Sequence, residues 1–529
     1  MSVVPPSRAC VPPCIYSSYY TTFSLLFPYL YFNISSNNAK ILDFALQRGI
    51  IYGLITMKRS FTMTKSQSRE IDFLEGPLIK NILMFTLPVL ATGVLQFLYN
   101  ASDSAVVGWL IGSNALGAVS STGALSNLIT GLFIGLSVGA SVAVSHSVGS
   151  RRFDDAHDTV QTSISISCIL GVLVAAFGFF ACKPLLTLMG TVDECLDQSV
   201  RYMRIIFIGM PAQMIYNYGT SILRANGDTR HPLEFLVISG AVNVVCNIIL
   251  VYFFRDVWCV AAATIISQYL SAVLALRLLC RIEGCCRLDI RHLYVRRDKF
   301  MKILRIGLPA GVQSVLFSFS NVIIQSSINS FQNAAIVAGN GAAANVDGLI
   351  YIAQNSFYHT ALTFTGQNLG GRRFERIRSV CRSCLILVCT VGLAIGGICY
   401  AFGPQLLSVF ARDDTETIKY GMVRLLYMGV PYFLCGTMEV MSGMLRGLGA
   451  SMTSMIVSLL GACVFRVIWI ATVFRMVGTL ESIYISFPIS WLLTTLAAYV
   501  CYRIVFARIK RRLEAQTPHT DTDSGTVQS

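Results

Sequence analysis

Long apolar segments, separated by short polar ones, follow one another along the chain from about Leu78 onward. A helix needs about 20 residues to cross the roughly 30 Å hydrocarbon core of a bilayer, and each segment is long enough to do so. We place them near residues 79–107, 115–144, 160–182, 197–225, 232–254, 257–279, 303–330, 336–366, 380–402, 417–446, 453–474 and 480–506. This pattern predicts an all-α polytopic membrane protein with about twelve transmembrane helices.

The second half of the pattern repeats the first at a constant offset. Pro88 corresponds to Pro309 (309 − 88 = 221), and the segment GSRRF at 149–153 corresponds to GGRRF at 370–374 without a gap. A register shared over this length indicates an internal duplication. Because each copy contains six segments, both copies enter the membrane in the same sense. We therefore expect two six-helix lobes related by a pseudo-twofold axis along the membrane normal.

Basic residues gather in every second connection between the apolar segments. A cluster lies at 277–299, and Arg-Arg pairs occur at 151–152 and 372–373. The remaining connections are neutral or acidic, as at 193–197 and 413–416. Because cytoplasmic loops carry an excess of Lys and Arg, we expect the basic connections to face the cytoplasm. With an even number of helices, both termini are expected on that side as well.

The repeat also divides the chain into regions. We expect an N-terminal extension of uncertain status at 1–70, an N-lobe at 71–280, a cytoplasmic linker at 281–300, a C-lobe at 301–508 and a cytoplasmic tail at 509–529. Residues 1 to about 62 do not match the repeat. Met57 or Met63 could be the native start, with an incorrectly assigned start upstream. The alternative is an additional interfacial or membrane-spanning helix.

The composition supports a membrane protein and excludes other classes. The chain is 54% hydrophobic and 13% charged, with a mean hydropathy of +0.62, which is too apolar for a soluble protein. The net charge is +14, but the basic residues lie between the apolar segments and form no patch interleaved with aromatic residues. We therefore expect no nucleic-acid partner. The 17 cysteines are scattered, and no phosphate-binding loop or catalytic motif occurs. We expect no enzyme, no cofactor and no metal beyond a possible Na⁺.

Ionisable residues inside the apolar segments are the first candidates for function, because a charge at the bilayer centre costs at least about 2.5 to 3.5 kcal/mol. Asp103 lies in the first segment, with Asn100 one turn earlier on the same helix face. Such a carboxylate can be neutralised by Na⁺, by a proton or by a cationic substrate, but by only one of them at a time. The alternative is a structural carboxylate that neighbouring helices satisfy with hydrogen bonds.

Uncharged polar residues of the fifth and sixth segments could complete a cation site. Asn243 and Asn247 are four residues apart and therefore share one helix face, and Thr264 follows in the sixth segment. Amide and hydroxyl oxygens can bind Na⁺ but cannot take up a proton near neutral pH. Asparagines in apolar helices serve about as often to join helices together.

The second half offers further candidates. Asp347, with Tyr351 one turn later, and Glu439 are expected to face inward, and at least one of them to contact the substrate or the coupling ion. Arg466 is a possible structural partner of one of these carboxylates. Pro88 and Pro309 occupy corresponding positions, where a paired kink would suit a hinge, although kinks can also serve packing alone.

Several motifs together resemble the multidrug and toxic compound extrusion (MATE) transporters. They include EGPLIKNILMFTLP, LYNASDSAVVG with Asp103, YNYGTSILRANGDTRHP and GMLRGLG, and the resemblance runs from about Ile71 to Ile509. The chain looks like a bacterial member of the DinF-like branch. The resemblance implies that Asp103, Asn243, Asn247 and Thr264 form the N-lobe cation site. Asn247 departs from the pattern, because related proteins often have Asp there.

The expected function is that of a secondary active antiporter in the bacterial inner membrane. It would export small cationic amphiphilic drugs or toxic organic compounds in exchange for Na⁺ or H⁺, by alternating access and as a monomer in the lipid bilayer. The first alternative is a flippase or exporter of lipid-linked glycan or another amphipathic metabolite. A channel is a further alternative, which substrate-dependent ion flux at a fixed ratio would exclude.

Overall fold

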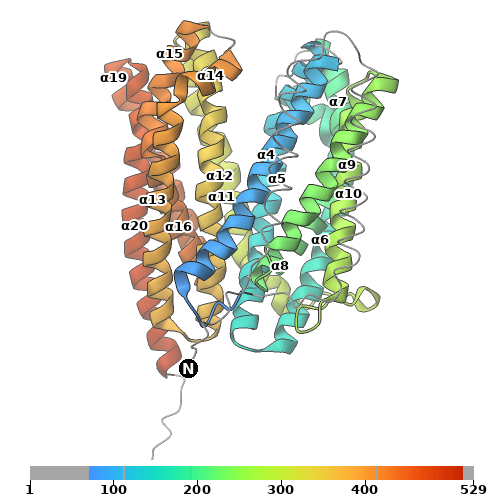
Figure 1. The fold of residues 1–529 in the computed structure, drawn as a ribbon, viewed down its shortest axis with the longest axis vertical. Coiled ribbons are helices and arrows are strands. Elements are labelled where there is room, and N and C mark those ends of the chain that lie inside the picture. Colours follow the sequence, from blue (N-terminus) through green and yellow to red (C-terminus); the bar gives the residue numbers. More distant parts are fainter. Residues whose placement is uncertain (1–70, 111–112, 190, 192, 412–413, 516–529) are drawn as a thin grey trace, which may run out of the picture. The chain divides into compact units, whose positions relative to one another are not determined.

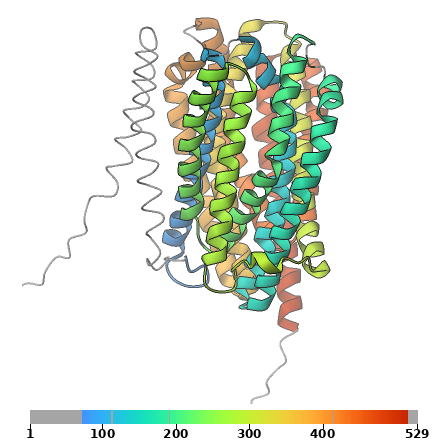
Figure 2. The same cartoon turned by 90° about the vertical axis from the view of Figure 1, so that its right-hand side faces the viewer.

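A computed structural model describes residues 71–110, 113–189, 191, 193–411 and 414–515. Within these ranges the chain forms helices and connecting loops and contains no strand. The predictions for the extension 1–70, and for most of the tail after Ala515, lie outside the described residues. Figures 1 and 2 show the described helices from two directions.

The helices of the first copy form the N-lobe. They are α4 (Leu78–Leu110), α5 (Ser113–Gly149), α6 (Phe153–Leu188), α7 (Asp193–Ile208), α8 (Met210–Ala225), α9 (Arg230–Phe254) and α10 (Trp258–Arg281). The connection to the second copy contains one short turn of 3₁₀ helix, η2 (Ile290–His292).

The helices of the second copy form the C-lobe, which Figure 1 shows as a separate group. They are α11 (Arg297–Asn329), α12 (Ala334–Gly370), α13 (Phe374–Ala401), α14 (Gly403–Ala411), α15 (Thr415–Arg424), η3 (Leu425–Gly429), η4 (Val430–Tyr432), α16 (Phe433–Gly447), α17 (Ser451–Ser458), η5 (Leu459–Val464), α18 (Phe465–Trp469), η6 (Ile470–Phe474), α19 (Arg475–Val477) and α20 (Leu480–Ala515). Helices α5 and α12 have 37 residues each and begin 221 residues apart (334 − 113 = 221), so the sequence repeat is also a structural repeat.

Ten spans of the described part are long and apolar enough to cross a membrane. Each lobe contains one further span that is interrupted near its middle. In the N-lobe, α7 gives way to α8 at Gly209, just before Pro211. In the C-lobe, α15 continues through a wide turn, η3, and then a tight turn, η4, which contains Pro431. Proline has no backbone N–H to continue the helical ladder, which explains both interruptions. The predicted architecture of twelve spans in two lobes is confirmed.

The lobes touch where α5 packs against α11 and α12. Glycines permit this close approach: a Cβ added at Gly135 would lie 2.2 Å from the backbone N of Gly311, and one added at Gly149 would lie 2.1 Å from the carbonyl oxygen of Gln367. The His146 Nε2 also lies 2.7 Å from the carbonyl oxygen of Gly447, across the interface. These contacts lie toward the end of the helices that bears the Arg-rich connections, which we call the basic end.

Helix α4 contacts both lobes. Near its start, Phe85 and Val89 belong to a buried apolar cluster otherwise formed mainly by C-lobe residues, and the Thr86 hydroxyl lies 2.8 Å from that of Thr360 on α12. Near its end, Val107 packs with the ends of α9 and α10. Figure 1 shows α4, in blue, crossing from one group of helices to the other. Pro88 lies inside α4, within the segment that contacts the C-lobe and about four turns before Asp103.

Candidate functional site

The carboxylate of Asp103 is the centre of the candidate site. It projects from α4 toward α9 and α10, where the Asn247 Nδ2 donates a hydrogen bond to its Oδ1 at 2.6 Å. The Thr264 hydroxyl donates to its other oxygen, Oδ2, at 3.3 Å. Helix α4 and the consecutive helices α9 and α10, which are distant from it in sequence, therefore meet at one carboxylate inside the N-lobe. A carboxylate with two donors is compatible with a charge at low exposure, because both oxygens are hydrogen-bonded.

The two asparagines of α9 form the inner wall of this site. Asn243 and Asn247 are one helical turn apart and nearly or fully buried, at 4% and 0% exposure. The Asn247 Nδ2 donates a second hydrogen bond, to the Asn243 Oδ1, at 3.3 Å. We call Asp103, Asn243, Asn247 and Thr264 the N-lobe site. The structure brings together all four residues that the resemblance to the MATE transporters assigned to one site.

One polar atom of the N-lobe site has no partner among the described residues. The Asn247 Oδ1 is buried and accepts no hydrogen bond there. An unsatisfied buried acceptor costs about 1 to 3 kcal/mol. A half-turn of the Asn247 amide would point this oxygen at the carboxylate, where it could bind a cation together with Asp103 and Thr264. The chemistry of these donors, carboxylate, amide and hydroxyl oxygens, fits Na⁺.

The same carboxylate can also take a proton. A protonated Asp103 would donate through one oxygen and still accept through the other, and the amides of Asn243 and Asn247 would remain neutral. With a single carboxylate, the N-lobe site can be neutralised by one monovalent cation or by one proton. Asn100, one turn earlier on α4, is exposed rather than buried with these groups.

Asp347 of the C-lobe belongs to a buried ion pair. The Arg424 Nε donates to its Oδ2 at 2.8 Å, and Asp347 is only 3% exposed. Arg424 also donates to the Asn340 Oδ1, which accepts a second hydrogen bond from the Tyr484 hydroxyl at 3.1 Å. The sequence reading missed Arg424, because it lies at the end of a short polar helix and 77 residues from its partner.

Glu439 of α16 has a different environment. It is 9% exposed and makes no ion pair or hydrogen bond within the described part of the chain. Arg446, two turns later on the same helix, is buried and donates to the Tyr358 hydroxyl at 2.6 Å and to the Gln313 Oε1 at 2.8 Å. Tyr351 of α12 is 39% exposed and interacts electrostatically with Glu439. Glu439 and Arg446 interact electrostatically, but among the described residues they form no ion pair with each other.

Arg466 has partners other than the ones expected. Its Nε donates to the Ser490 hydroxyl at 2.8 Å, and its guanidinium lies 4.0 Å from the ring centroid of Phe487. Among the described residues it forms no ion pair. The expectation that Arg466 pairs with Asp347 or Glu439 is therefore wrong. The cation–π contact stabilises the buried guanidinium charge, so that no carboxylate partner is required.

Both prolines with a proposed hinge role lie inside long helices. The carbonyl oxygen of Pro88 accepts a hydrogen bond from the hydroxyl of Thr92, one turn later in α4, at 2.8 Å. Pro309 is buried in α11, beside the residues that contact α5. Each proline therefore lies close to a contact between the lobes.

Comparison with known proteins agrees with this geometry. The MatE family model matches the chain twice, over residues 88–253 and 309–472, once in each lobe. The chain is 26% identical to a probable multidrug resistance protein, YoeA, of Bacillus subtilis, over 81% of this chain and 94% of that protein. It is 20% identical to the multidrug export protein MepA of Staphylococcus saprophyticus, over 81% and 95%.

Solved structures share the fold. The outward-facing conformation of a multidrug resistance MATE family transporter of the MOP superfamily superposes with a TM-score of 0.78 at 23% identity, over 84% of this chain and 100% of that one. A transporter of the same superfamily from Pyrococcus furiosus, described as having a binding pocket of reversed polarity, gives 0.78 at 24% identity, over the same shares. The chain therefore belongs to the MatE family of membrane transporters.

Proposed function

We propose that this protein exports cationic amphiphilic drugs or toxic organic compounds in exchange for Na⁺ or H⁺, by alternating access. The observation that carries the proposal is the N-lobe site, in which one carboxylate meets Asn247 and Thr264 beside a buried amide oxygen without a partner. The multidrug resistance and export proteins to which the chain is similar support the substrate class.

Exclusive neutralisation of Asp103 would provide the coupling. If Na⁺ or a proton neutralises the carboxylate, a cationic substrate loses its electrostatic attraction to Asp103. Binding of one cation therefore promotes release of the other. The driving force is sufficient, because one charge that moves through about 100 mV provides about 2.3 kcal/mol. That free energy corresponds to an almost fiftyfold gradient of substrate.

Helix α4 offers a route from the N-lobe site to the C-lobe. Its end carries Asp103, and its start packs in the C-lobe cluster with Phe85 and Val89. A change of occupancy at Asp103 that altered α4 on either side of Pro88 would therefore change a contact between the lobes. We propose Pro88 as the hinge of this movement and Pro309 as its counterpart in α11.

The orientation follows from charge. If the basic end faces the cytoplasm, as the Lys and Arg excess indicates, the contacts of α5 with α11 and α12 close the cytoplasmic side. This conformation would then be open to the outside. We place the protein in the bacterial inner membrane, with one chain as the working unit because both lobes and the N-lobe site belong to that chain.

Export of an amphipathic anion, such as a lipid-linked glycan, is the second candidate function. Arg446 and Arg466 favour it, because both are buried in the C-lobe and neither forms an ion pair with a carboxylate in the described part of the chain. Glu439 and the N-lobe site favour cations instead. The two candidate functions therefore require substrates of opposite charge.

Purified protein in proteoliposomes tests the proposal. An outwardly directed flux of a cationic dye is expected only when a Na⁺ or pH gradient of opposite direction is imposed, at a fixed ratio of ion to dye. Dye flux without a gradient requirement would indicate a channel and would refute antiport. Gradient-driven movement of a fluorescent anionic lipid, without movement of the cationic dye, would instead establish the second candidate.

A further inference from the structure

The connection between the lobes is folded onto the N-lobe. Cys286 and Leu288 are 1% and 2% exposed and belong to the N-lobe's apolar core. The backbone N–H of Leu288 donates to the carbonyl oxygen of Leu279 at 2.9 Å, which ties the connection back to the end of α10. This part of the connection is therefore an ordered part of the basic end.

A second set of contacts fixes the connection to the start of α6. The side-chain amide of Gln161, in the orientation that satisfies both of its ends, bonds the backbone N and O of Asp289 at 2.7 and 3.2 Å. The Tyr294 hydroxyl donates to the Asp158 Oδ1 at 2.6 Å, and partial burial together with this bond raises the pKa of Tyr294 to about 12. The space between the connection and α6 is therefore preformed.

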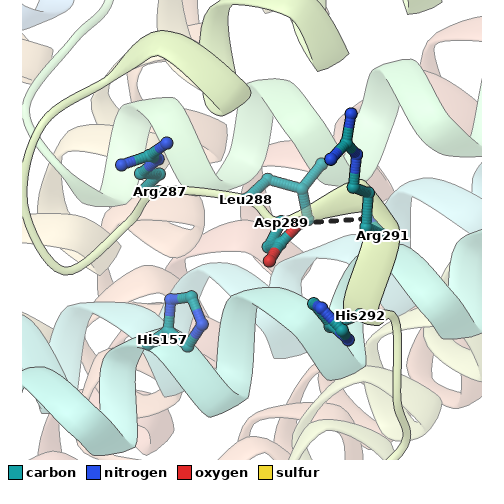
Figure 3. Close-up of a pocket in the computed structure, with 6 residues that line it drawn as sticks. All are labelled: His157, Arg287, Leu288, Asp289, Arg291 and His292. Carbon is teal, nitrogen blue, oxygen red and sulfur yellow. Dashed lines mark hydrogen bonds between the residues drawn. The ribbon is translucent and has the colours of Figure 1, made fainter.

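That space is a pocket of about 570 Å³ with cationic walls. It is lined by His157, Arg287, Leu288, Asp289, Arg291 and His292. Figure 3 shows His157 on α6, with the other five residues on the connection and Asp289 between the two arginines. The Asp289 Oδ1 accepts a hydrogen bond from the backbone N–H of Arg291 at 3.0 Å.

The lining of this pocket carries an excess of positive charge, because Arg287 and Arg291 share it with one acid, Asp289, whose carboxylate forms no ion pair with either of them in the described ranges. The nearby acids on α6 already have other partners: Asp155 pairs with Lys299 at 2.7 Å, and Asp158 pairs with Arg296. Neither Arg287 nor Arg291 forms an ion pair in the described ranges. Two guanidinium groups with two imidazoles nearby suit a phosphate, which arginine can bind through two parallel hydrogen bonds.

Apolar side chains next to the pocket indicate where that phosphate comes from. Ile290, Leu293 and Val295 alternate with the basic residues of the connection and are 53%, 40% and 45% exposed. The connection joins the ends of two membrane spans, so it lies where the helices meet the bilayer surface. Exposed apolar residues among basic ones are typical of segments that insert into a membrane interface.

We propose that the pocket of Arg287, Arg291, His157 and His292 binds the phosphate of an anionic phospholipid, with Ile290 and Leu293 against its acyl chains. A bound lipid would fix the connection between the lobes to the membrane surface. This site is separate from the N-lobe site and does not depend on the proposed transport function. Basic pockets on the cytoplasmic side of membrane proteins are known to select anionic headgroups.

Lipid binding to the full-length protein in detergent tests the proposal. Native mass spectrometry would compare phosphatidylglycerol with phosphatidylcholine, for the unchanged protein and for R287Q/R291Q. Loss of two interfacial arginines should weaken phosphatidylglycerol binding about thirtyfold and leave phosphatidylcholine binding unchanged. The matched control is R508Q/R511Q, which removes two exposed arginines of α20 near the same end.

Each alternative has its own result. Equal weakening by R508Q/R511Q would mean general surface attraction and would overturn the pocket. Binding of inorganic phosphate that R287Q/R291Q abolishes, without any preference for phosphatidylglycerol, would assign the pocket to a free phosphate and overturn the lipid. Because an arginine variant could fold poorly, L293S provides a second test: it should weaken binding of phosphatidylglycerol but not of its water-soluble glycerophosphoglycerol headgroup.

Discussion

The glycine contact between the lobes allows a quantitative prediction. In Gly135→Ala, the new Cβ would lie 2.2 Å from the backbone N and 2.3 Å from the Cα of Gly311. Ordinary contact begins at 3.4 Å, so α5 and α11 would have to move apart by about 1.2 Å (3.4 − 2.2 = 1.2). The obstructing atoms belong to the backbone and cannot rotate away.

Overpacking of this kind costs about 1 to 3 kcal/mol. The cost applies only while the lobes touch at the basic end, so the population with that end closed should fall about 5- to 150-fold relative to the open one. Hydrogen exchange of the protein in nanodiscs measures this change. We expect faster exchange in peptides that cover 131–149 and 303–314, together with slower export.

Gly123→Ala is the matched control. It lies on the same helix, and its new Cβ would meet no atom within 4 Å. Both substitutions raise helix propensity by the same amount, about 1 kcal/mol, so the difference between them reports the contact alone. Indistinguishable exchange and export in the two variants would refute the idea that this glycine contact closes the basic end.

Three further predictions concern other parts of the molecule. Asp347→Asn leaves Arg424 buried without its counter-ion and should lower the free energy of unfolding by about 3–5 kcal/mol, seen as a lower melting temperature. An Asp347→Leu/Arg424→Leu double variant should recover most of this loss. Failure to recover it would contradict a purely structural ion pair. Asn247→Asp adds a second carboxylate to the N-lobe site and should change the pH or Na⁺ dependence of export; an unchanged profile would remove Asn247 from coupling. Pro88→Ala restores a backbone N–H and should stiffen α4, which slows export without weakening dye binding; equal rates would argue against a hinge.

The number of spans could be predicted because it depends on a local signal, whereas the grouping of the four N-lobe site residues came from the resemblance to the MATE transporters. The length of the apolar segments alone defines most spans. A carboxylate in an apolar helix is expected to face the interior of the bundle, because exposure to lipid is costly. The i, i+4 spacing of Asn243 and Asn247 places both amides on one face of α9, whichever helix lies opposite. The structure adds the distances and the unpartnered amide oxygen of Asn247.

The pairing of charges in the C-lobe could not be predicted in the same way. Arg424 meets Asp347 because α15 folds back against α12, and helix packing of this kind leaves no trace in the spacing of the two residues. For Arg466 an ion pair was predicted that the structure does not contain. Its guanidinium instead donates a hydrogen bond to Ser490 and lies against the ring of Phe487. Pairs that form between helices depend on how the helices are packed.

The contact of α4 with both lobes was also missed. The repeat assigns α4 to the N-lobe, because Pro88 of α4 corresponds to Pro309 of α11, the first helix of the second copy. Its first turns nevertheless bury Phe85 and Val89 in the C-lobe cluster. A division based on the repeat alone therefore hides the fact that the helix bearing Asp103 also packs against the C-lobe.

Gradient-driven export by Asp103→Asn in proteoliposomes tests the central claim most directly. The substitution preserves shape and removes the charge, and Asp256→Asn, in the neighbouring loop between α9 and α10, makes the same chemical change outside the N-lobe site. We predict that Asp103→Asn loses export driven by a Na⁺ or pH gradient while the protein remains folded, and that Asp256→Asn retains it. Export by Asp103→Asn at the rate of the unchanged protein would contradict the account.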